Sequence, residues 1–276
     1  MAGASVASIR FLALLVLLLP ATAAADPPQR IVSMNLCTDQ LVMLLADRSR
    51  IASVSYLAAD PRSSVLADEA RGLHQNHGLA EEILPLRPDL VIAGSFTTRP
   101  TVFLLRNLGY PVVDVPVANG LDDIRANIRR IAAAVGETAR GDRLIADFDA
   151  RLDRHVPTQD RRPLAALYWA NGWTSGQGTL ASAIVAAAGL RNLADTLGIA
   201  GTGQLPLETL LAAAPEVLIM GRVYDGPARA NEVFRHPALR RAFSGKPIVR
   251  VPDRFWVCGT PFVAEAVARL SEAVGR

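Results

Sequence analysis

An internal repeat constrains this chain more than any other feature. The stretch EEILPLRPDLVIAG over residues 81–94 recurs in altered form as ETLLAAAPEVLIMG over residues 208–221. Each copy begins with a glutamate, has a proline seven positions later, and continues through an acidic residue into an apolar run that ends in glycine. An apolar run that follows a helix-breaking proline is typical of a buried strand. The repeat therefore predicts two similar lobes, each with a short helix followed by a buried strand.

The segments around the repeat predict the fold class. Short apolar runs alternate with longer amphipathic stretches in both halves of the chain; the strand-like runs are 30–34, 51–55, 89–94, 111–115, 164–169, 216–220 and 248–251. This alternation is typical of parallel βα units. We expect an α/β protein with two lobes built on central, mostly parallel sheets. A small molecule would bind in the cleft between the lobes, outside the carboxyl ends of the strands.

The N-terminal segment predicts export. Arg10 precedes an apolar run over residues 11–19, Pro20 ends the run, and small residues follow over 21–25. This is the pattern of a secretory signal peptide, and the run is about half the ~20 residues that a membrane-spanning helix needs. We expect a signal peptide over residues 1–25 and a periplasmic mature protein.

The middle of the chain predicts a connector. Residues 121–135 and 137–156 are helical in pattern with a break at Gly136, and the second helix has no strand beside it in sequence. At 1.5 Å per residue this second helix would extend about 30 Å. We therefore expect one long helix to bridge the lobes, with the N-terminal lobe over 26–120, connector helices over 121–160 and the C-terminal lobe over 161–276.

Charge and motifs exclude several classes of function. The formal net charge is only +3, and the arginines are scattered among acids, so no nucleic-acid partner is expected. Ser175 lies outside any G-x-S-x-G elbow, and the chain has no H-E-x-x-H, P-loop or G-x-G-x-x-G motif. We expect a monomeric binding protein without a cofactor, and an enzyme is the rival class.

Candidate ligand-binding residues lie in the loops that follow the predicted strands. They are polar, aromatic or sulfur-bearing: Asn35, Cys37, Tyr56, His77, Ser95 and Phe96 in the first half, and Trp173, Arg254, Trp256 and Cys258 in the second. The rings of Trp173 and Trp256 suit a planar macrocycle or an aromatic chelate. The alternative is that one or both tryptophans cover the seam between the lobes.

Two histidines form an H-x-x-H pair in one of these loops. His74 and His77 alone do not make a zinc site, which needs three or four ligands, and we expect no bare metal ion. His77 stands next to Gly78 and just before a helix, which favours a place in the cleft. It would bind an axial position of a metal chelate or donate a hydrogen bond, whereas His74 is interpreted as an exposed loop residue.

The whole segment from Arg30 to about Val274 resembles a known family. The motif over residues 86–91, the opening strand and helix over 30–41, and the stretches 174–176 and 256–261 are similar to the helical-backbone class of periplasmic binding proteins. This class serves iron-siderophore, haem and cobalamin importers, and the last two stretches resemble its cobalamin-binding member. The resemblance implies two α/β lobes, limited lobe motion, and docking glutamates that engage arginines of a dimeric ABC importer permease. These glutamates correspond to Glu81 and Glu208, although an acid in the first turn of a helix also has a simple capping role.

The resemblance also places the only two cysteines on cleft-facing loops, one from each lobe. Cys37 and Cys258 then have three interpretations: a disulfide that holds the cleft nearly shut, two soft ligands for a metal centre, or two unrelated buried thiols. The family has no general requirement for cysteine at these places, so the sequence leaves all three open.

We therefore expect a protein that captures a metal-chelate nutrient and delivers it to an ABC importer. A cobalamin-like corrinoid and a ferric siderophore rank close together as ligands, and haem ranks third. A free-standing scavenger or sensor would have the same fold without docking glutamates.

Overall fold

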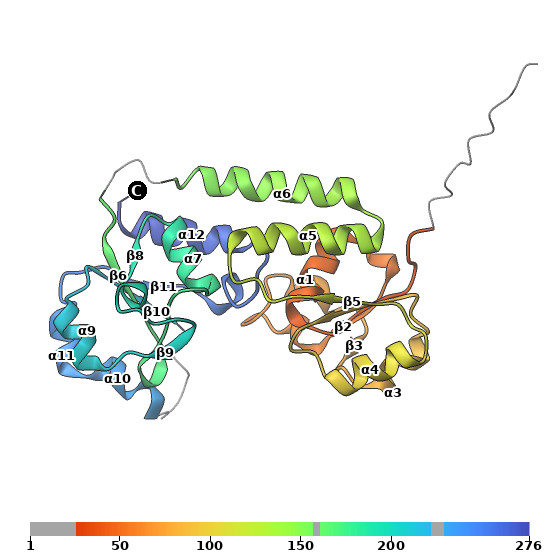
Figure 1. Ribbon diagram of the computed structural model, residues 1–276, viewed down its shortest axis with the longest axis horizontal. Helices are drawn as coiled ribbons and strands as arrows, with labels where there is room; N and C mark the ends of the chain where they lie inside the picture. Colours follow the sequence, from red (N-terminus) through yellow and green to blue (C-terminus); the bar gives the residue numbers. More distant parts are fainter. Residues whose placement is uncertain (1–25, 157–160, 222–228, 276) are drawn as a thin grey trace, which may run out of the picture.

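The computed structural model describes residues 26–156, 161–221 and 229–275 of the chain. It has two α/β lobes side by side, with a pair of long helices running across one side of both (Figure 1). The predicted fold class of two lobes with mostly parallel sheets is confirmed. The predicted signal peptide over residues 1–25 lies outside the described residues, and the predicted lobe boundaries stay a prediction.

The N-terminal lobe is built on a five-stranded parallel sheet in the order β3-β2-β1-β4-β5. The strands are β1 (Ile31–Ser33), β2 (Ile51–Ser55), β3 (Gln75–Asn76), β4 (Leu90–Gly94) and β5 (Val112–Val115). The helices between them are α1 (Leu36–Leu45), α2 (Ala67–Ala70), α3 (Ala80–Ile83) and α4 (Arg99–Asn107). The strand order changes direction between β1 and β4, so this pair forms the topological switch point of the lobe.

The C-terminal lobe has a four-stranded parallel sheet in the order β11-β10-β6-β8, with the switch point between β6 and β10. The strands are β6 (Leu164–Tyr168), β8 (Arg191–Asn192), β10 (Val217–Met220) and β11 (Ile248–Arg250). A short antiparallel pair, β7 (Trp173–Ser175) and β9 (Thr202–Gln204), lies beside the sheet. The helices are α7 (Leu180–Ala187), α8 (Leu193–Thr196), α9 (Leu207–Ala213), α10 (Glu232–Arg235), α11 (Pro237–Ala242) and α12 (Val263–Ala273).

The sequence repeat corresponds to the same backbone path in both lobes. Arg87 and Ala214, which precede the repeated prolines, both adopt the left-handed conformation, with φ of 46° and 48°. The acidic residue after each proline then accepts a backbone hydrogen bond at the start of the first strand of its lobe. Asp89 accepts a hydrogen bond from the backbone N–H of Arg30 (2.7 Å), and Glu216 accepts one from that of Leu164 (3.2 Å).

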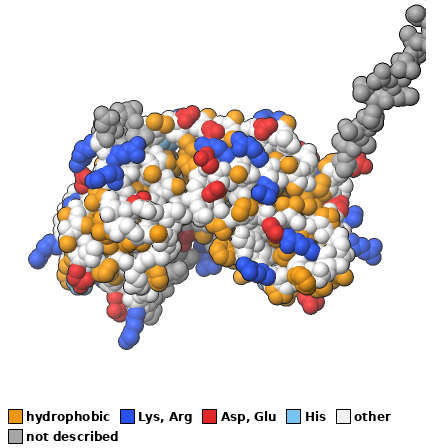
Figure 2. Space-filling model, in the orientation of Figure 1, with side chains coloured by type: hydrophobic (Ala, Val, Ile, Leu, Met, Phe, Trp, Pro, Cys, Tyr) orange, Lys and Arg blue, Asp and Glu red, His pale blue; other side chains and the backbone are white. Residues whose placement is uncertain are grey.

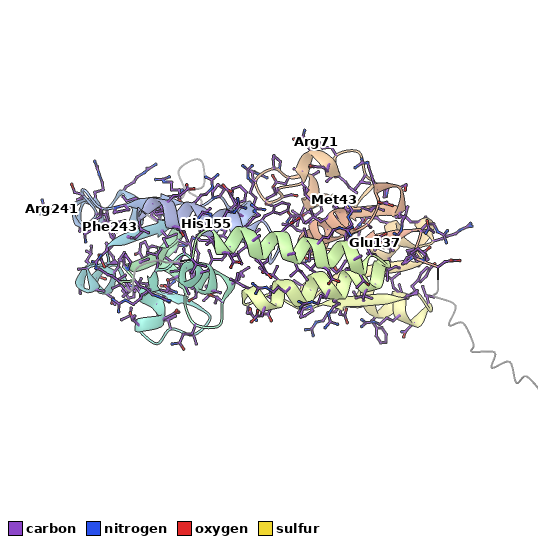
Figure 3. All side chains as sticks on the ribbon, turned by 90° about the horizontal axis from the view of Figure 1, so that it is seen from above. Met43, Arg71, Glu137, His155, Arg241 and Phe243 are labelled. Carbon is purple, nitrogen blue, oxygen red and sulfur yellow. A yellow bond between two sulfur atoms is a disulfide. The ribbon has the colours of Figure 1, made fainter. Side chains whose placement is uncertain are left out.

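The connector is a pair of antiparallel helices, not a single rod. Helix α5 (Leu121–Val135) ends at Gly136, whose φ of 75° turns the chain sharply into α6 (Thr138–Asp153). Glu137 in this turn pairs with Arg50 of the N-terminal lobe at 2.8 Å. Viewed from above, Glu137 lies over the N-terminal lobe and His155, just beyond α6, lies over the C-terminal lobe, so α6 makes the crossing (Figure 3).

One hydrophobic core runs through both lobes. A single cluster of buried side chains includes Leu41 from α1, Ile128 from α5, Leu167 from β6 and Val267 from α12. The two lobes are therefore packed against each other through their helices on the connector side and are not independent bodies on a flexible link. Among the described residues, no helix combines the length and apolarity needed to cross a bilayer.

Candidate ligand-binding site

The carboxyl ends of the two sheets face each other. Cys37 in the first turn of α1, just after β1, forms a disulfide with Cys258 in the segment between β11 and α12, with 5.1 Å between the Cα atoms. Nearby, Nη1 of Arg254 donates a hydrogen bond across the lobes to the carbonyl oxygen of Pro61 (3.3 Å). Both contacts join loops that follow parallel strands, which is where α/β proteins bind their ligands.

The disulfide decides among the three interpretations of the cysteines. Both sulfur atoms are bonded to each other, so neither the metal-ligand interpretation nor that of two unrelated thiols holds. Gly259 beside the bridge lies so close to Ala118 of the N-terminal lobe that an added Cβ would overlap the Ala118 side chain. The segment that carries Cys258 is thus fitted tightly against the opposite lobe.

A cavity of about 120 Å³ opens beside the disulfide. Four of the predicted ligand-binding residues line it, together with Val257 and Gly259 of the other lobe; the four are Asn35, Cys37, Ser95 and Phe96. On its lower side the molecule is hollowed between the lobes, at the edge opposite the connector helices (Figure 2). Phe96 is 86 % exposed, which is unusual for a large apolar side chain unless it meets a partner.

A stacked pair of rings lies at the end of the neighbouring strands. The rings of Tyr56 and His77 are 4.8 Å apart between centroids and 24° from parallel. Glu82 orients the histidine: one carboxylate oxygen lies 2.8 Å from His77 Nδ1 and the other accepts the backbone N–H of His77 at 2.6 Å. That backbone donor and then the imidazole hold the pKa of Glu82 below its ordinary value. Nδ1 is occupied, so Nε2 is the nitrogen available to a ligand.

On the C-terminal lobe, a tight turn presents Trp173. Asn171 and Gly172 both have positive φ (58° and 72°), and the backbone N–H of Trp169 bonds to the carbonyl of Trp173 across the turn at 2.8 Å. Glycine is favoured at position 172 because φ is positive there and an added Cβ would lie 3.1 Å from the carbonyl oxygen of Leu205. The indole of Trp173 remains 42 % exposed, as a ligand contact would need.

Trp256 and Arg254 are less exposed than Trp173. Trp256 is 8 % exposed and packs edge-on against Trp169, with 5.9 Å between ring centroids. Trp256 therefore supports Trp169 and offers little surface of its own. Arg254 is half-buried, its guanidinium reaches across the lobes, and its Nε has no hydrogen-bond partner among the described residues.

Trp169 itself was not among the residues predicted from sequence. It follows directly on β6, so its position suggested only the end of a strand. The signal that identifies it is the strand order, because β6 lies at the switch point of the second lobe, and this order is visible only in the structure.

A buried carboxyl group lies beneath the N-terminal rim of the cleft. Asp39, in the first turn of α1, is fully buried and accepts a hydrogen bond from Ser55 Oγ at 2.5 Å. Burial raises the pKa of Asp39 from 3.8 to about 7, although hydrogen bonds from Ser33 and Ser55 oppose the shift. Asn76 joins this network through Nδ2, which donates to the Ser33 carbonyl (2.9 Å) and to Ser53 Oγ (2.8 Å). The network fixes the ends of β1, β2 and β3 relative to one another.

The two repeated glutamates lie away from the connector. Glu81 on α3 and Glu208 on α9 are exposed, and both helices lie on the side of the molecule opposite α6 (Figure 1). Neither carboxylate makes a hydrogen bond or ion pair within the described residues. The charge of Glu208 does act on buried Tyr168, whose pKa is raised first by burial and then by this charge.

The carboxyl ends of the strands of the two α/β lobes face each other, and helix α6 crosses both lobes on the other side. This arrangement defines a bilobal solute-binding protein. The sequence agrees with this class. Residues 31–243 match the family described as periplasmic binding protein, and the chain belongs to that family. It is a family of substrate-binding proteins rather than enzymes, and its name and relatives imply a periplasmic location.

Relatives of this chain include proteins of known name. The chain is 30 % identical over 243 residues to a vitamin B12-binding protein of Pectobacterium carotovorum, covering 84 % of each. It is 28 % identical over 263 residues to a cobalamin-binding protein of Halobacterium salinarum, covering 89 % of this chain and 69 % of the relative. Among solved structures, a periplasmic heme-binding protein from Roseiflexus in apo form has a TM-score of 0.72 and 25 % identity, covering 89 % of this chain and 97 % of that one.

Proposed function

We propose that this protein captures a metal-chelate nutrient between its lobes and delivers it to the permease of an ABC importer. The observation that carries the proposal is the set of rings at the facing carboxyl ends of the two sheets. Tyr56 and His77 are stacked and exposed on the N-terminal lobe, where Phe96 is also exposed just after β4. Trp173 is exposed on the C-terminal lobe. Exposed rings on both walls suit a ligand with an extended flat or apolar surface.

The relatives favour a corrinoid among the chelates. The proteins from Pectobacterium carotovorum and Halobacterium salinarum bind cobalamin by name, and a structural neighbour binds haem by name. Imidazole suits the metal of either chelate, and His77 is held with Nε2 free. A cobalamin-like corrinoid is thus the first candidate, a ferric siderophore stays the runner-up, and haem is the alternative that the Roseiflexus neighbour supports.

Delivery rests on Glu81 and Glu208. The matched left-handed residues Arg87 and Ala214 fix equivalent backbone paths after the two helices, so the glutamates occupy equivalent places on the lobes. Two equivalent carboxylates on one side of the molecule fit a two-fold symmetric partner with arginines. A free-standing scavenger would have no use for this arrangement. We further propose export through the segment 1–25, action as a monomer, and no catalytic activity.

Titration of the purified mature protein tests the proposal. Tryptophan fluorescence is followed while cyanocobalamin, haem and a ferric trihydroxamate are added separately. We expect saturable quenching by at least one of them, and weaker binding in a Trp173→Ala variant. The control is Trp173→Phe, which keeps a ring at the same position and retains most of the affinity.

Failure to bind any of the three ligands would contradict the chelate function while leaving the family membership intact. Turnover of generic ester or phosphate substrates by the same preparation would overturn the assignment as a binding protein.

A further inference from the structure

The two lobes place different side chains at the same point of their sheets. In the N-terminal lobe β1 pairs with β4 so that Ser33 lies opposite Ile92, and continuing this register by two residues places Asn35 beside Gly94. In the C-terminal lobe β6 pairs with β10 so that Tyr168 lies opposite Met220, and the next residue pair is Trp169 and Gly221. Asn35 and Trp169 therefore stand at the two switch points, where ligands bind in α/β folds.

The glycine that ends each copy of the repeat makes room for these side chains. A Cβ added to Gly94 would lie 2.9 Å from Asn35 Cγ, closer than side-chain carbons approach. A Cβ added to Gly221 would overlap the indole of Trp169 directly. Each repeat glycine thus leaves space for one side chain. Asn35 lies across the end of β4 at Gly94, and Trp169 lies across the end of β10 at Gly221.

The two side chains offer different chemistry. Asn35 Oδ1 is occupied because it accepts the backbone N–H of Cys37 at 3.0 Å and caps α1. Its Nδ2 has no partner among the described residues, so it is a free hydrogen-bond donor at the wall of the 120 Å³ cavity. Trp169 has a half-buried indole that packs against the shared hydrophobic core and makes a T-shaped contact with Trp256, and its backbone N–H donates to the carbonyl oxygen of Trp173.

We infer that Trp169 and Asn35 together select the ligand: Trp169 packs against a flat conjugated face, and Asn35 Nδ2 donates to an oxygen atom at the edge of that ligand. The inference rests on the proposed function and narrows it to planar chelates with oxygen-bearing substituents. A rounded ferric trihydroxamate has no extended flat face for the indole and is disfavoured. The contact with Trp256 limits the movement of the Trp169 indole, so its position is set before a ligand arrives.

Four variants test the assignment in the same fluorescence titration, with affinity for cyanocobalamin, haem and a ferric trihydroxamate as the readout. Trp169→Leu removes the ring, and Gly221→Ala displaces it without removing it. Asn35→Asp keeps an oxygen acceptor that caps α1 and replaces the amide donor by a carboxylate oxygen, which adds a negative charge. Gly72→Ala is the matched control, because its added Cβ meets only the far end of the long Arg48 side chain and Gly72 lies outside the cleft loops. Thermal unfolding by circular dichroism shows that each variant is folded.

We expect the wild type to bind a planar chelate more tightly than the ferric trihydroxamate. Trp169→Leu, Gly221→Ala and Asn35→Asp should each weaken planar-chelate binding by about tenfold or more, and Gly72→Ala should leave it unchanged. If the wild type binds a planar chelate and folded Trp169→Leu binds it equally well, the assignment of Trp169 is wrong and the proposed function stands. Tighter binding of the trihydroxamate by the wild type would overturn the planar selectivity alone. Binding of none of the three would contradict the proposed function, and this inference with it.

Discussion

Cys37 and Cys258 are bonded to each other across 221 positions of the chain, and the bond joins the two lobes at the mouth of their cleft. The bridge lies among the loops that follow the parallel strands, whereas α6 crosses both lobes on the connector side. The lobes are therefore restrained at both edges, so the width of the cleft is largely set before a ligand binds.

Removing the bridge should cost stability without abolishing the fold. In a Cys37→Ser/Cys258→Ser double variant the unfolded chain regains the freedom of a very long loop, and we expect a loss of about 2–5 kcal/mol in the free energy of unfolding. The shared core should keep the variant folded at 25 °C. Denaturant unfolding monitored by circular dichroism measures the difference.

Reductant provides the control for this prediction. It should lower the stability of the wild type to that of the double serine variant and should leave the double variant unchanged. Equal stability of the oxidised wild type and the double variant would show that the bridge contributes nothing to the free energy of unfolding.

The buried carboxyl of Asp39 predicts a specific pH dependence of stability. Its pKa is about 7 in the fold against an ordinary 3.8, so between these pH values the folded state binds the proton more tightly than the unfolded state does. Stability from this group is complete below about pH 4 and is lost as the pH rises to about 7. Asp39→Asn removes the ionisation. It should therefore stabilise the protein relative to wild type above pH 7, by at most about 4 kcal/mol, and by progressively less as the pH falls to 4.

Urea unfolding of wild type and Asp39→Asn at several pH values between 4 and 8 measures this difference directly. Asp68→Asn is the matched control, because this acid of the same lobe is 81 % exposed. A difference between wild type and Asp39→Asn that does not change with pH would show that Asp39 is ionised in the folded state throughout.

The paired glutamates should affect delivery and not capture. A Glu81→Gln/Glu208→Gln variant keeps the size of both side chains and removes both charges, so its affinity for the chelate should match the wild type. Its affinity for the permease reconstituted in nanodiscs should fall about tenfold or more, because charge-assisted contacts are lost on both lobes. Glu272→Gln on α12, an exposed acid far from the cleft opening, serves as the control. Undiminished binding of the double variant to the permease would rule out docking through these residues.

The two histidines of one loop should differ in their effect on binding. His77 is held by Glu82 and stacked on Tyr56, whereas His74 is exposed in the same loop. His77→Ala should weaken binding of cyanocobalamin or haem several-fold and change the visible spectrum of the bound haem if Nε2 binds iron. His74→Ala should do neither. Equal losses in the two variants would mean that the loop as a whole, and not the oriented imidazole, contacts the ligand.

Local pattern was enough to predict the elements that position the site. The repeated prolines mark the starts of β4 and β10 because they end the preceding helices, and the short apolar runs after them are typical of buried strands. The equal spacing of glutamate and proline in the two copies of the repeat also singled out Glu81 and Glu208. These features depend on residues close together in sequence, so they are visible without a structure.

Features that depend on distant contacts could not be predicted in this way. The pairing of Cys37 with Cys258 requires the relative position of the lobes, which no local pattern contains. The strands β3 and β8 have two residues each and no measurable periodicity, and β7 and β9 are short polar segments that pair only because a turn brings them together. Trp169 was not singled out, and Trp256 was predicted as a ligand contact without any sign that it is only 8 % exposed, because the packing of these two rings against each other is a contact between distant parts of the chain.

The continuous core also bears on how new specificities can be made from this scaffold. Because side chains of both lobes interlock in one cluster, exchanging a whole lobe with that of a relative would create mismatched packing along the entire seam. Exposed residues of the loops at the strand ends, such as Phe96 and Trp173, lie outside that cluster. Chimeras with new ligands should therefore be assembled by grafting these loops onto the intact body, in the way that antibody engineers transfer binding loops between frameworks.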